Sequence, residues 1–542
     1  MSSLSLDNAA AAFLRTKSAA EVRSDLLARR EIALLDVREE AHHAQGHPLF
    51  AANLPLSRIE LEAFARLPRR TTPIVVLDDG EGLARRAAER LLALGYSDVK
   101  LLAGGLSGWC NAGYEVFRDV NAPSKAFGEL VEAERHTPSL SAQEVKALID
   151  AKADVVIVDA RRFDEFQTMS IPTATSVPGA ELVLRVRDLA PDPATRVIVN
   201  CAGRTRSIIG TQSLINAGLP NPVAALRNGT IGWTLARQEL DRGAVDTFPN
   251  VRPDIQTMAA ASARRVADQA GVARADLATI AHWIEEDDRT VYCFDVRTPE
   301  EYATGHLPGF RGAPGGQLVQ ETDVFAPVRG AKIVLVDDDG VRANMTASWL
   351  AQMAWEVAVL DGLGSVDFSE CGARREPLPD LPPIPQDAWV GATRLHDWLE
   401  QKRESALAVL DFAPSRLYEH RHIPGAWFAL RSQLAEALDA VPGATRYVLT
   451  SPEGIAAHFA WREAVTLAPQ PVHLLDGGTD AWIASGFRVD ALPKYASQPI
   501  DRYRRPYEGT DAPPSAIEAY LDWEYGLVEQ LHRDGTHGFR VI

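Results

Sequence analysis

Residues 196–210, RVIVNCAGRTRSIIG, decide the fold. A short run of apolar residues ends at Asn200, and Cys201 follows in a glycine-containing loop that opens a helical pattern. Apolar runs of this length are typical of strands that are buried in a sheet. A buried strand that leads through a tight loop into a helix is the unit of an α/β fold with a parallel sheet. In such folds ligands bind where the carboxyl ends of strands meet helix N-termini.

The same pattern occurs four times along the chain. Each copy opens with an apolar strand that ends in aspartate, continues through a second short apolar run and a helical pattern, and closes on an aromatic residue. The closing aromatic follows the aspartate by 73, 74, 73 and 71 residues in the pairs Asp36 and Trp109, Asp159 and Trp233, Asp295 and Phe368, and Asp411 and Trp482. A repeat of this regularity indicates repeated structural units. We therefore predict four tandem α/β domains, each with a mainly parallel central sheet flanked by helices.

The repeats set the expected domain bounds. The four domains are predicted over residues 1–120, 135–245, 270–372 and 388–490, followed by a C-terminal segment over 491–542. Residues 119–140 and 245–270 are mixed-polar and are interpreted as linkers, and the proline-rich residues 375–385 as an extended spacer. The apolar spacing of residues 514–531 predicts a helix that docks on another surface.

Composition excludes several classes of protein. With 542 residues, 46% hydrophobic and 24% charged, the chain is typical of globular proteins built from several domains. A net charge of −17 argues against nucleic acid as a partner. No apolar stretch is long enough to span a membrane and no signal peptide is recognised, so we expect no membrane partner and a cytoplasmic location. The four cysteines are too scattered for a disulfide scaffold or a CxxC metal site.

The loop that begins at Cys201 has the features of a nucleophile site. Backbone N–H groups in such a turn point inward, and together with the positive end of the following helix they stabilise a thiolate. We therefore expect the pKa of the Cys201 thiol to fall. Two guanidinium groups, Arg204 and Arg206, are suited to bind an oxyanion such as thiosulfate or a sulfonate. The predicted substrate is a small anion.

These residues resemble the rhodanese, or thiosulfate sulfurtransferase, superfamily. The resemblance covers all four repeats and rests on the Asp-Val-Arg strand ends, the sequence EYATGHLPG of residues 301–309, and the closing Gly-Gly-x-x-x-Trp. The second repeat departs from the middle signature, with Ser-Ile-Pro-Thr-Ala over residues 170–174.

The resemblance implies a site and a reaction. The six-residue loop from Cys201 to Arg206 is the expected active site, and the Cys201 thiolate attacks the outer sulfur of a donor to form a persulfide. The substrate would then be held by the backbone and side chains of the loop, namely Ala202, Gly203, Arg204, Thr205, Arg206 and Ser207. The resemblance also implies that Asp159 orients a loop arginine by ion pairing, and capping of the following turn is an equally good role for it. Neither a metal nor an organic cofactor is required.

The resemblance leaves the reaction partners open. A small anionic donor such as thiosulfate is expected, cyanide is the usual test acceptor of the family, and thioredoxin, glutathione or another protein thiol are equally compatible acceptors in the cell. An alternative function is a sulfur-relay or regulatory scaffold that is fed by a partner protein. A cysteine phosphatase is less favoured, because related phosphatases use a longer loop with five residues between Cys and Arg, and Ser207 stands in the place of that arginine.

The other three repeats lack the cysteine. Asp78, Asp337 and Ser451 stand where Cys201 stands in the second repeat. A carboxylate repels an anionic substrate, and Ser451 has no evident base to activate it, so these repeats are predicted to be catalytically silent. We expect them to serve as scaffold, as a partner surface or as walls of the pocket of the second repeat.

Other reactive side chains receive no catalytic role. Cys110, Cys293 and Cys371 lie outside the loop positions and are interpreted as structural or incidental. The histidines at 42, 43 and 47 do not have the ligand spacing of a metal site, so we expect them on the surface of a loop.

Overall fold

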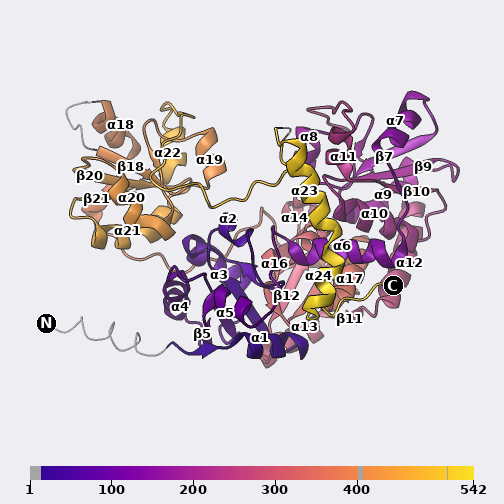
Figure 1. Cartoon of the computed structure of the whole chain (residues 1–542), viewed down its shortest axis with the longest axis horizontal. Helices are drawn as coiled ribbons and strands as arrows, with labels where there is room; N and C mark the ends of the chain where they lie inside the picture. Colours follow the sequence, from indigo (N-terminus) through magenta and orange to yellow (C-terminus); the bar gives the residue numbers. More distant parts are fainter. Residues whose placement is uncertain (1–13, 401–406, 510) are drawn as a thin grey trace.

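The computed structural model describes residues 14–400, 407–509 and 511–542. The described chain contains four sheets, each at the centre of one domain with helices packed around it (Figure 1). The prediction of four α/β domains with mainly parallel sheets is confirmed. Domains 1, 2 and 3 pack against one another, whereas domain 4, drawn in orange, stands to one side (Figure 1).

Domain 2 carries Cys201, and all its strand pairs are parallel. In spatial order its sheet contains β6 (Ser139–Leu140), β10 (Val223–Leu226), β9 (Arg196–Asn200), β7 (Val155–Asp159) and β8 (Thr175–Ser176). Strand β9 is central, and its last four residues are buried because both faces of the sheet are covered. The helices are α7 (Ala142–Asp150), α8 (Phe163–Thr168), the 3₁₀ turn η3 (Gly179–Glu181), α9 (Leu182–Leu189), α10 (Thr205–Asn216) and α11 (Gly229–Leu235).

Domain 1 has the same order of strands with one addition from elsewhere in the chain. Its sheet runs β1 (Thr16–Lys17), β5 (Val99–Leu102), β4 (Ile74–Leu77), β2 (Ile32–Asp36) and β14 (Val328–Arg329), with β3 (Ala52–Asn53) also on β2. Strand β14 belongs to the domain 3 segment and pairs antiparallel with β2. The helices are α1 (Ala19–Leu27), α2 (Glu40–His43), η2 (Leu56–Arg58), α3 (Ile59–Arg66), α4 (Leu83–Ala93) and α5 (Gly105–Asn111).

Domain 3 is joined to domain 1 by this strand and by a common core of buried side chains. Its own sheet runs β11 (Ala273–Ala275), β16 (Glu356–Leu360), β15 (Lys332–Val336), β12 (Val291–Asp295) and β13 (Arg311–Gly312). The helices are α13 (Leu277–Glu286), α14 (Pro299–Thr304), α15 (Gly315–Gln320), α16 (Thr322–Phe325), α17 (Arg342–Gln352) and η4 (Ser365–Asp367).

Domain 4 has separate cores on the two faces of its sheet. The sheet runs β17 (Trp389–Val390), β21 (Val472–Leu475), β20 (Arg446–Thr450), β18 (Leu407–Asp411) and β19 (Trp427–Phe428). The helical elements are η5 (Gln386–Ala388), α18 (Ala392–Glu400), α19 (Ser415–His420), η6 (Arg431–Gln433), α20 (Leu434–Ala440), α21 (Ile455–Leu467) and α22 (Gly478–Ala484). Its contact with domain 1 includes ion pairs, such as the pair of Arg431 with Glu60 at 2.6 Å.

The two segments interpreted as linkers each contain a long helix. Helix α6 (Ala122–Arg135) lies in the first, and α12 (Pro253–Gln269) lies in the second. Residues 122–131 of α6 are all buried, because α10 of domain 2 packs on one side and α24 on another. Helix α12 fills the junction between α9 of domain 2 and α17 of domain 3. The mixed polarity of these segments suggested exposed linkers and did not indicate that α6 is buried. The polar side chains of α6 are buried because they pair with residues of neighbouring domains.

The C-terminal arm, residues 491–542, returns from domain 4 across the molecule (Figure 1). It forms α23 (Pro514–Tyr525) and α24 (Leu527–Asp534), which both contact α6. The predicted helix over 514–531 is thus two helices that meet at Gly526. The backbone N–H of Arg540 donates to the Gln352 carbonyl at 2.9 Å, so the arm ends on domain 3.

Within the described residues, no helix is both long enough and apolar enough to cross a lipid bilayer.

Candidate active site

Cys201 lies between the end of β9 and the start of α10, and its residue is 1% exposed. The Cys201 Sγ donates to the Ser207 Oγ at 3.4 Å, and the Ser207 hydroxyl donates to the Arg204 carbonyl at 2.8 Å. The backbone N–H of Ser207 also interacts with the sulfur. The sulfur therefore lies at the first turn of α10, where free N–H groups and the helix dipole favour negative charge.

The pKa of the Cys201 thiol is raised, so the expected fall is wrong for this structure. Burial is the largest cause, because a thiolate loses its hydration when water is excluded. Arg206 and Ser207 act in the opposite direction and lower the pKa, but burial outweighs them. The site as it stands therefore holds the thiol, with the groups that favour the thiolate already in place.

A glycine from the closing signature supports the cysteine from behind. Gly229, at the start of α11, has φ +52°, and a Cβ there would lie 2.2 Å from the Cys201 carbonyl oxygen. The next residue, Thr230, donates its backbone N–H to that oxygen at 2.9 Å. This close approach of two backbones requires glycine, which explains the Gly in the repeated Gly-x-x-x-Trp pattern.

Arg204 does not face an open pocket. Its Nε and Nη2 donate to the two carboxylate oxygens of Glu129 on α6, at 2.7 and 2.8 Å, and Nη2 also pairs with Glu132. Its Nη1 donates to Tyr525 in the arm at 3.1 Å. The structure thus places Arg204, predicted to bind substrate, in a buried ion pair that fastens the loop to α6 and the arm.

Arg206 is also paired, but it stays close to the sulfur. Its guanidinium donates to both oxygens of Glu165 on α8, at 2.7 and 2.9 Å. Burial alone would raise the pKa of Glu165, yet the charge and hydrogen bonds of Arg206 lower it to about 2. Because Arg206 lowers the pKa of Cys201 as well, it is the loop arginine that acts on the nucleophile.

Asp159 pairs with an arginine outside the loop. It accepts the backbone N–H of Arg161 at 3.0 Å, which caps the turn, and it binds the Arg161 guanidinium at 2.9 and 2.8 Å. It also accepts from the Asn200 amide at 2.7 Å, because β7 and β9 place these two residues side by side. Asp159 therefore contacts neither Arg204 nor Arg206 and instead fixes the strand end from which Cys201 departs.

The other loop residues are covered by neighbouring elements. Ala202 is buried in a cluster with Tyr507, Ile517 and Tyr520 of the arm. A Cβ on Gly203 would lie 3.6 Å from Glu524 Oε2. The Thr205 side chain lies so close to α6 that a Cβ on Gly128 would come within 2.8 Å of it. The arm and α6 together close most sides of the loop.

The three loops without cysteine have the same geometry. In each, the residue at the cysteine position accepts the backbone N–H of the residue six positions later, as Cys201 does with Ser207. The contacts are Ala84 N to Asp78 Oδ2 at 3.0 Å, Ala343 N to Asp337 Oδ2 at 2.7 Å, and Ala457 N to Ser451 Oγ at 3.3 Å. In domains 1 and 3 a side-chain carboxylate therefore occupies the place of the sulfur.

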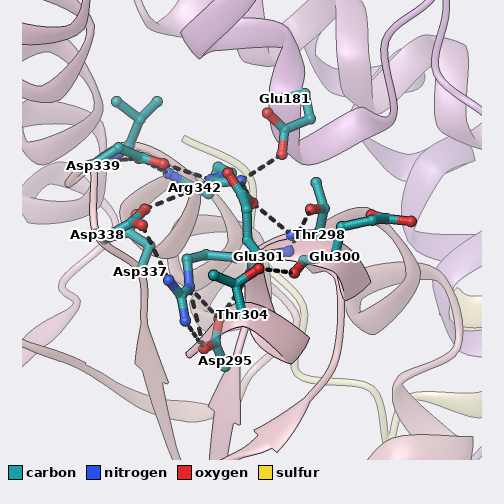
Figure 2. A network of polar contacts seen from close by, with 12 residues as sticks. Glu181, Asp295, Thr298, Glu300, Glu301, Thr304, Asp337, Asp338, Asp339 and Arg342 are labelled. Carbon is teal, nitrogen blue, oxygen red and sulfur yellow. Dashed lines mark hydrogen bonds and ion pairs between the residues drawn. The ribbon is translucent and has the colours of Figure 1, made fainter. Parts of the chain in front are cut away.

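Figure 2 shows the loop of domain 3. Arg342 takes the position of Arg206 and pairs with Glu301, which takes the position of Glu165. Three further carboxylates reach the same guanidinium, from Glu181 of domain 2 at 2.9 Å, Asp338 at 3.0 Å and Asp339 at 2.5 Å (Figure 2). This loop is an acidic interdomain joint, and its catalytic silence stays a prediction.

Sequence reasoning did not identify Glu165 and the arm as parts of the site. A sequence signal for Glu165 was available, because the same glutamate–arginine spacing occurs in two repeats. Glu165 precedes Arg206 by 41 residues, and Glu301 precedes Arg342 by 41 residues. No comparable signal existed for Tyr507 or Glu524, since the contact between the arm and the loop depends on how the domains pack.

Two of the three clustered histidines are buried, contrary to the expected surface loop. His43 and His47 are each 1% exposed and their rings stack with centroids 3.9 Å apart. His43 Nδ1 lies 2.9 Å from Asp36 Oδ2. In the part of the chain that the structure describes, no group of three or more potential ligand residues is placed to hold a metal ion. Cys110 and Cys371 are exposed, and Cys293 is half-buried in β12.

The comparisons with known proteins agree with this geometry. The family model described as a rhodanese-like domain matches four times, over residues 18–112, 141–236, 277–366 and 392–485. The crystal structure of a thiosulfate sulfurtransferase from Pseudomonas aeruginosa is 66% identical, covers 98% of this chain and 100% of its own, and superposes with a TM-score of 0.95.

Single-domain structures match more distantly. The Alr3790 protein from Anabaena sp. is 26% identical over 19% of this chain and 83% of its own, with a TM-score of 0.18. A rhodanese-related protein from Thermoplasma volcanium is 20% identical over 19% of this chain and 96% of its own, with a TM-score of 0.17. No curated protein sequence matches the chain. The four family-model matches cover more than half of the residues, and the chain therefore belongs to the rhodanese family.

Proposed function

We propose that the protein is a sulfurtransferase that carries a sulfane sulfur as a persulfide on Cys201. The observation that carries this proposal is the loop geometry, because one of four equivalent positions holds a cysteine against the N-terminus of a helix. The relative from Pseudomonas aeruginosa, similar over nearly the whole chain, is described as a thiosulfate sulfurtransferase. Thiosulfate is therefore the proposed donor.

The first half of the reaction loads the enzyme. The Cys201 thiolate attacks the outer sulfur of thiosulfate, a bond forms between the two sulfurs, and the sulfur–sulfur bond of thiosulfate breaks. Sulfite leaves with the electron pair of that bond. The Ser207 hydroxyl accepts the hydrogen bond of the thiol and is the first group on the path of its proton. Arg206 and the N–H groups at the start of α10 stabilise the negative charge on the persulfide.

The second half of the reaction removes the sulfur from the enzyme. A thiophilic acceptor, cyanide in the test tube or a thiol in the cell, attacks the terminal sulfur and breaks its bond to Cys201. Cys201 leaves as the thiolate, which the same groups stabilise. No other described cysteine occupies an equivalent loop position, so the whole cycle runs through one residue.

The test is turnover of thiosulfate and cyanide to thiocyanate and sulfite by the full chain. We expect turnover by the wild type and only background for Cys201→Ser, because removing a covalent nucleophile costs up to about a million-fold. The matched control is Cys110→Ser combined with Cys371→Ser, which removes the two exposed thiols and is expected to keep full activity. If the wild type takes up no sulfur from thiosulfate, a relay fed by a partner protein becomes the better function.

A further inference from the structure

A large cleft borders the Cys201 loop at Ala202 and Arg206. Its volume is about 830 Å³, and its lining includes Ala202 and Arg206 of the loop. The remaining walls come from every other part of the molecule: Glu40 of domain 1, Glu321 of domain 3, Arg416 of domain 4 and Arg505 of the arm. The three domains without cysteine thus all border the approach to Cys201.

This cleft is the larger of two cavities that border the loop, since the cavity beside Thr205 and Arg206 measures only about 40 Å³. Arg204 is paired with Glu129, Gly203 faces Glu524, and Thr205 packs against α6. A reactant that enters the larger cleft meets the loop at Ala202 and Arg206, the residues on either side of this part of the loop. Since Cys201 is 1% exposed, a flexible small molecule reaches it more readily than a cysteine on a folded protein surface.

The size of the cleft does not match the donor. Pockets for ligands of drug size typically measure about 300–1,000 Å³, and this cleft falls within that range. Thiosulfate consists of five heavy atoms and fills only a small part of such a volume. The cleft is therefore sized for the acceptor, which the proposed function leaves open.

The charges in the cleft indicate which acceptor fits. Arg416 and His420 lie on α19 of domain 4, and both are exposed. Among the described residues Arg416 has no carboxylate partner, so its guanidinium is free to bind one. The carboxylates of Glu419 and Glu321 line the same cleft and suit an ammonium group. A ligand with carboxylates and an ammonium complements this lining.

The equivalent cleft of domain 3 has the opposite character. It measures about 630 Å³ and is lined by Asp337, Asp338, Asp361 and Glu301, with Arg297 as its arginine. Arg297 is itself paired with Asp295 and Asp338. An anionic ligand is repelled there, so the cleft of domain 2 differs in having Arg416 in its lining without a carboxylate partner among residues 14–400, 407–509 and 511–542.

We propose that the cleft between domains 2 and 4 is the acceptor site, and that it takes a small thiol that carries carboxylate groups. This inference rests on the proposed function of Cys201. Arg416 binds a carboxylate of the acceptor at the outer end of the cleft and directs its thiol inward. The acceptor thiolate attacks the terminal sulfur of the Cys201 persulfide, the bond to Cys201 breaks, and Cys201 retains the electron pair. The products are the acceptor persulfide and the free enzyme.

The experiment begins with enzyme loaded by thiosulfate and freed of excess donor. Intact mass confirms the persulfide before any acceptor is added, so a failure of the proposed function is seen at this step and not later. Loss of the sulfur is then followed with glutathione and with glutathione diethyl ester, in which both carboxylates are blocked. Glutathione is the probe, and the ester is the matched thiol that keeps the ammonium group but has no carboxylate.

We expect the second-order rate constant for glutathione to exceed that for the diethyl ester by about ten-fold, as one charge-assisted contact provides. Arg416→Ala is expected to abolish this preference. The matched control is Arg421→Ala, which removes an exposed arginine of the same domain that does not line the cleft and is expected to keep the preference. Equal rates for the two thiols, or faster discharge by reduced thioredoxin at the same concentration, would overturn the proposal.

Discussion

The loops of domains 2 and 3 share a backbone and differ in what they hold. Both join a buried strand to a helix, both have an Asp–Arg pair at the preceding strand end, and both pair a loop arginine with a glutamate 41 residues earlier. Domain 2 places Cys201 against the N–H six residues on, and domain 3 places Asp337 there. A thiol occupies the loop of domain 2, whereas a carboxyl group of the chain itself occupies the loop of domain 3.

The comparison shows that the loop keeps the same backbone geometry when an aspartate replaces the cysteine. The carboxylate of Asp337 accepts the N–H groups of Gly340 and Ala343 at 3.0 and 2.7 Å, so the polar backbone stays satisfied without a ligand. The neighbouring Asp338 and Asp339 then hold Arg342 toward domain 2. In domain 3 the loop is a joint between domains. Four predictions sharpen the contrast with domain 2.

The largest effect is expected from moving the nucleophile. In a Cys201→Ser background, Asp337→Cys is expected to take up sulfur from thiosulfate at least about 100-fold more slowly than the native site, because like charges in contact cost several kcal/mol. Asp338 and Asp339 remain beside the new thiol and repel the dianion. Intact mass after incubation with thiosulfate measures the uptake. If the variant takes up sulfur as fast as the native site, the cysteine alone would be enough to make this loop a sulfur-accepting site, which would contradict the prediction.

The second contrast concerns the two glutamate–arginine pairs. Glu165→Gln leaves Arg206, whose side chain is 11% exposed, without its charged partner. We expect a loss of about 3 kcal/mol, the low end for breaking a buried ion pair. Glu301→Gln is expected to cost only about 1 kcal/mol, because Glu181, Asp338 and Asp339 still neutralise Arg342. Calorimetric melting of the two variants measures the difference. Equal losses would contradict this ranking of the two networks.

Much of the fold could be predicted from sequence because the signal repeats. The strands that end at Asp36, Asp159, Asp295 and Asp411 all form, and each pairs in parallel with the strand that leads into the following loop. Helices α6 and α12 were not predicted, because the segments that contain them occur between repeats and have no copy to compare with. Strand β14 was also not predicted, since it pairs with a sheet about 300 residues away in sequence.

The site could be predicted only as far as its local sequence reaches. The loop position of Cys201 followed from the strand–loop–helix pattern, but the partners of its arginines did not. Arg204 forms an ion pair with Glu129, which lies in another segment of the chain. Burial of the loop by Tyr507 and its neighbours raises the pKa of the Cys201 thiol, whereas the loop sequence predicted that it falls. Burial depends on tertiary packing, which no loop sequence contains.

A third prediction uses the strand end of domain 4. Domains 1, 2 and 3 have an arginine two residues after the aspartate, whereas domain 4 has Ala413, and burial raises the pKa of Asp411 to about 7. Because the folded state then holds the proton more tightly than the unfolded chain, stability is highest at acid pH and falls as pH rises through about 7. We expect domain 4 to lose about 3 kcal/mol between pH 5 and pH 8.

Hydrogen exchange of the amides in β18 and β20 measures this loss locally. Asp411→Asn has no proton to lose and is expected to remove the pH dependence. The amides of β7 and β9 in domain 2 serve as the internal control, since Asp159 there is paired with Arg161. A pH dependence that survives in the variant would show that another group causes it.

The smallest effect is expected at Ser207. The equivalent residues Ala84, Ala343 and Ala457 show that alanine fits this backbone position. Ser207→Ala removes the hydroxyl that helps to lower the pKa of Cys201, so the thiol pKa rises further and sulfur loading slows two- to five-fold, or about 0.5–1 kcal/mol. The pH dependence of alkylation of Cys201 by iodoacetamide reports the pKa. A faster reaction at pH 8 would contradict the role given to the hydroxyl.

The most direct test of the central claim is to locate the sulfur. The full chain is incubated with thiosulfate, its thiols are blocked, and peptide mapping by mass spectrometry assigns the added sulfur. The account predicts one sulfur per chain, on the peptide that contains Cys201, and its loss when cyanide is added. A sulfur found on Cys110, Cys293 or Cys371 would contradict it, as would a chain that carries none.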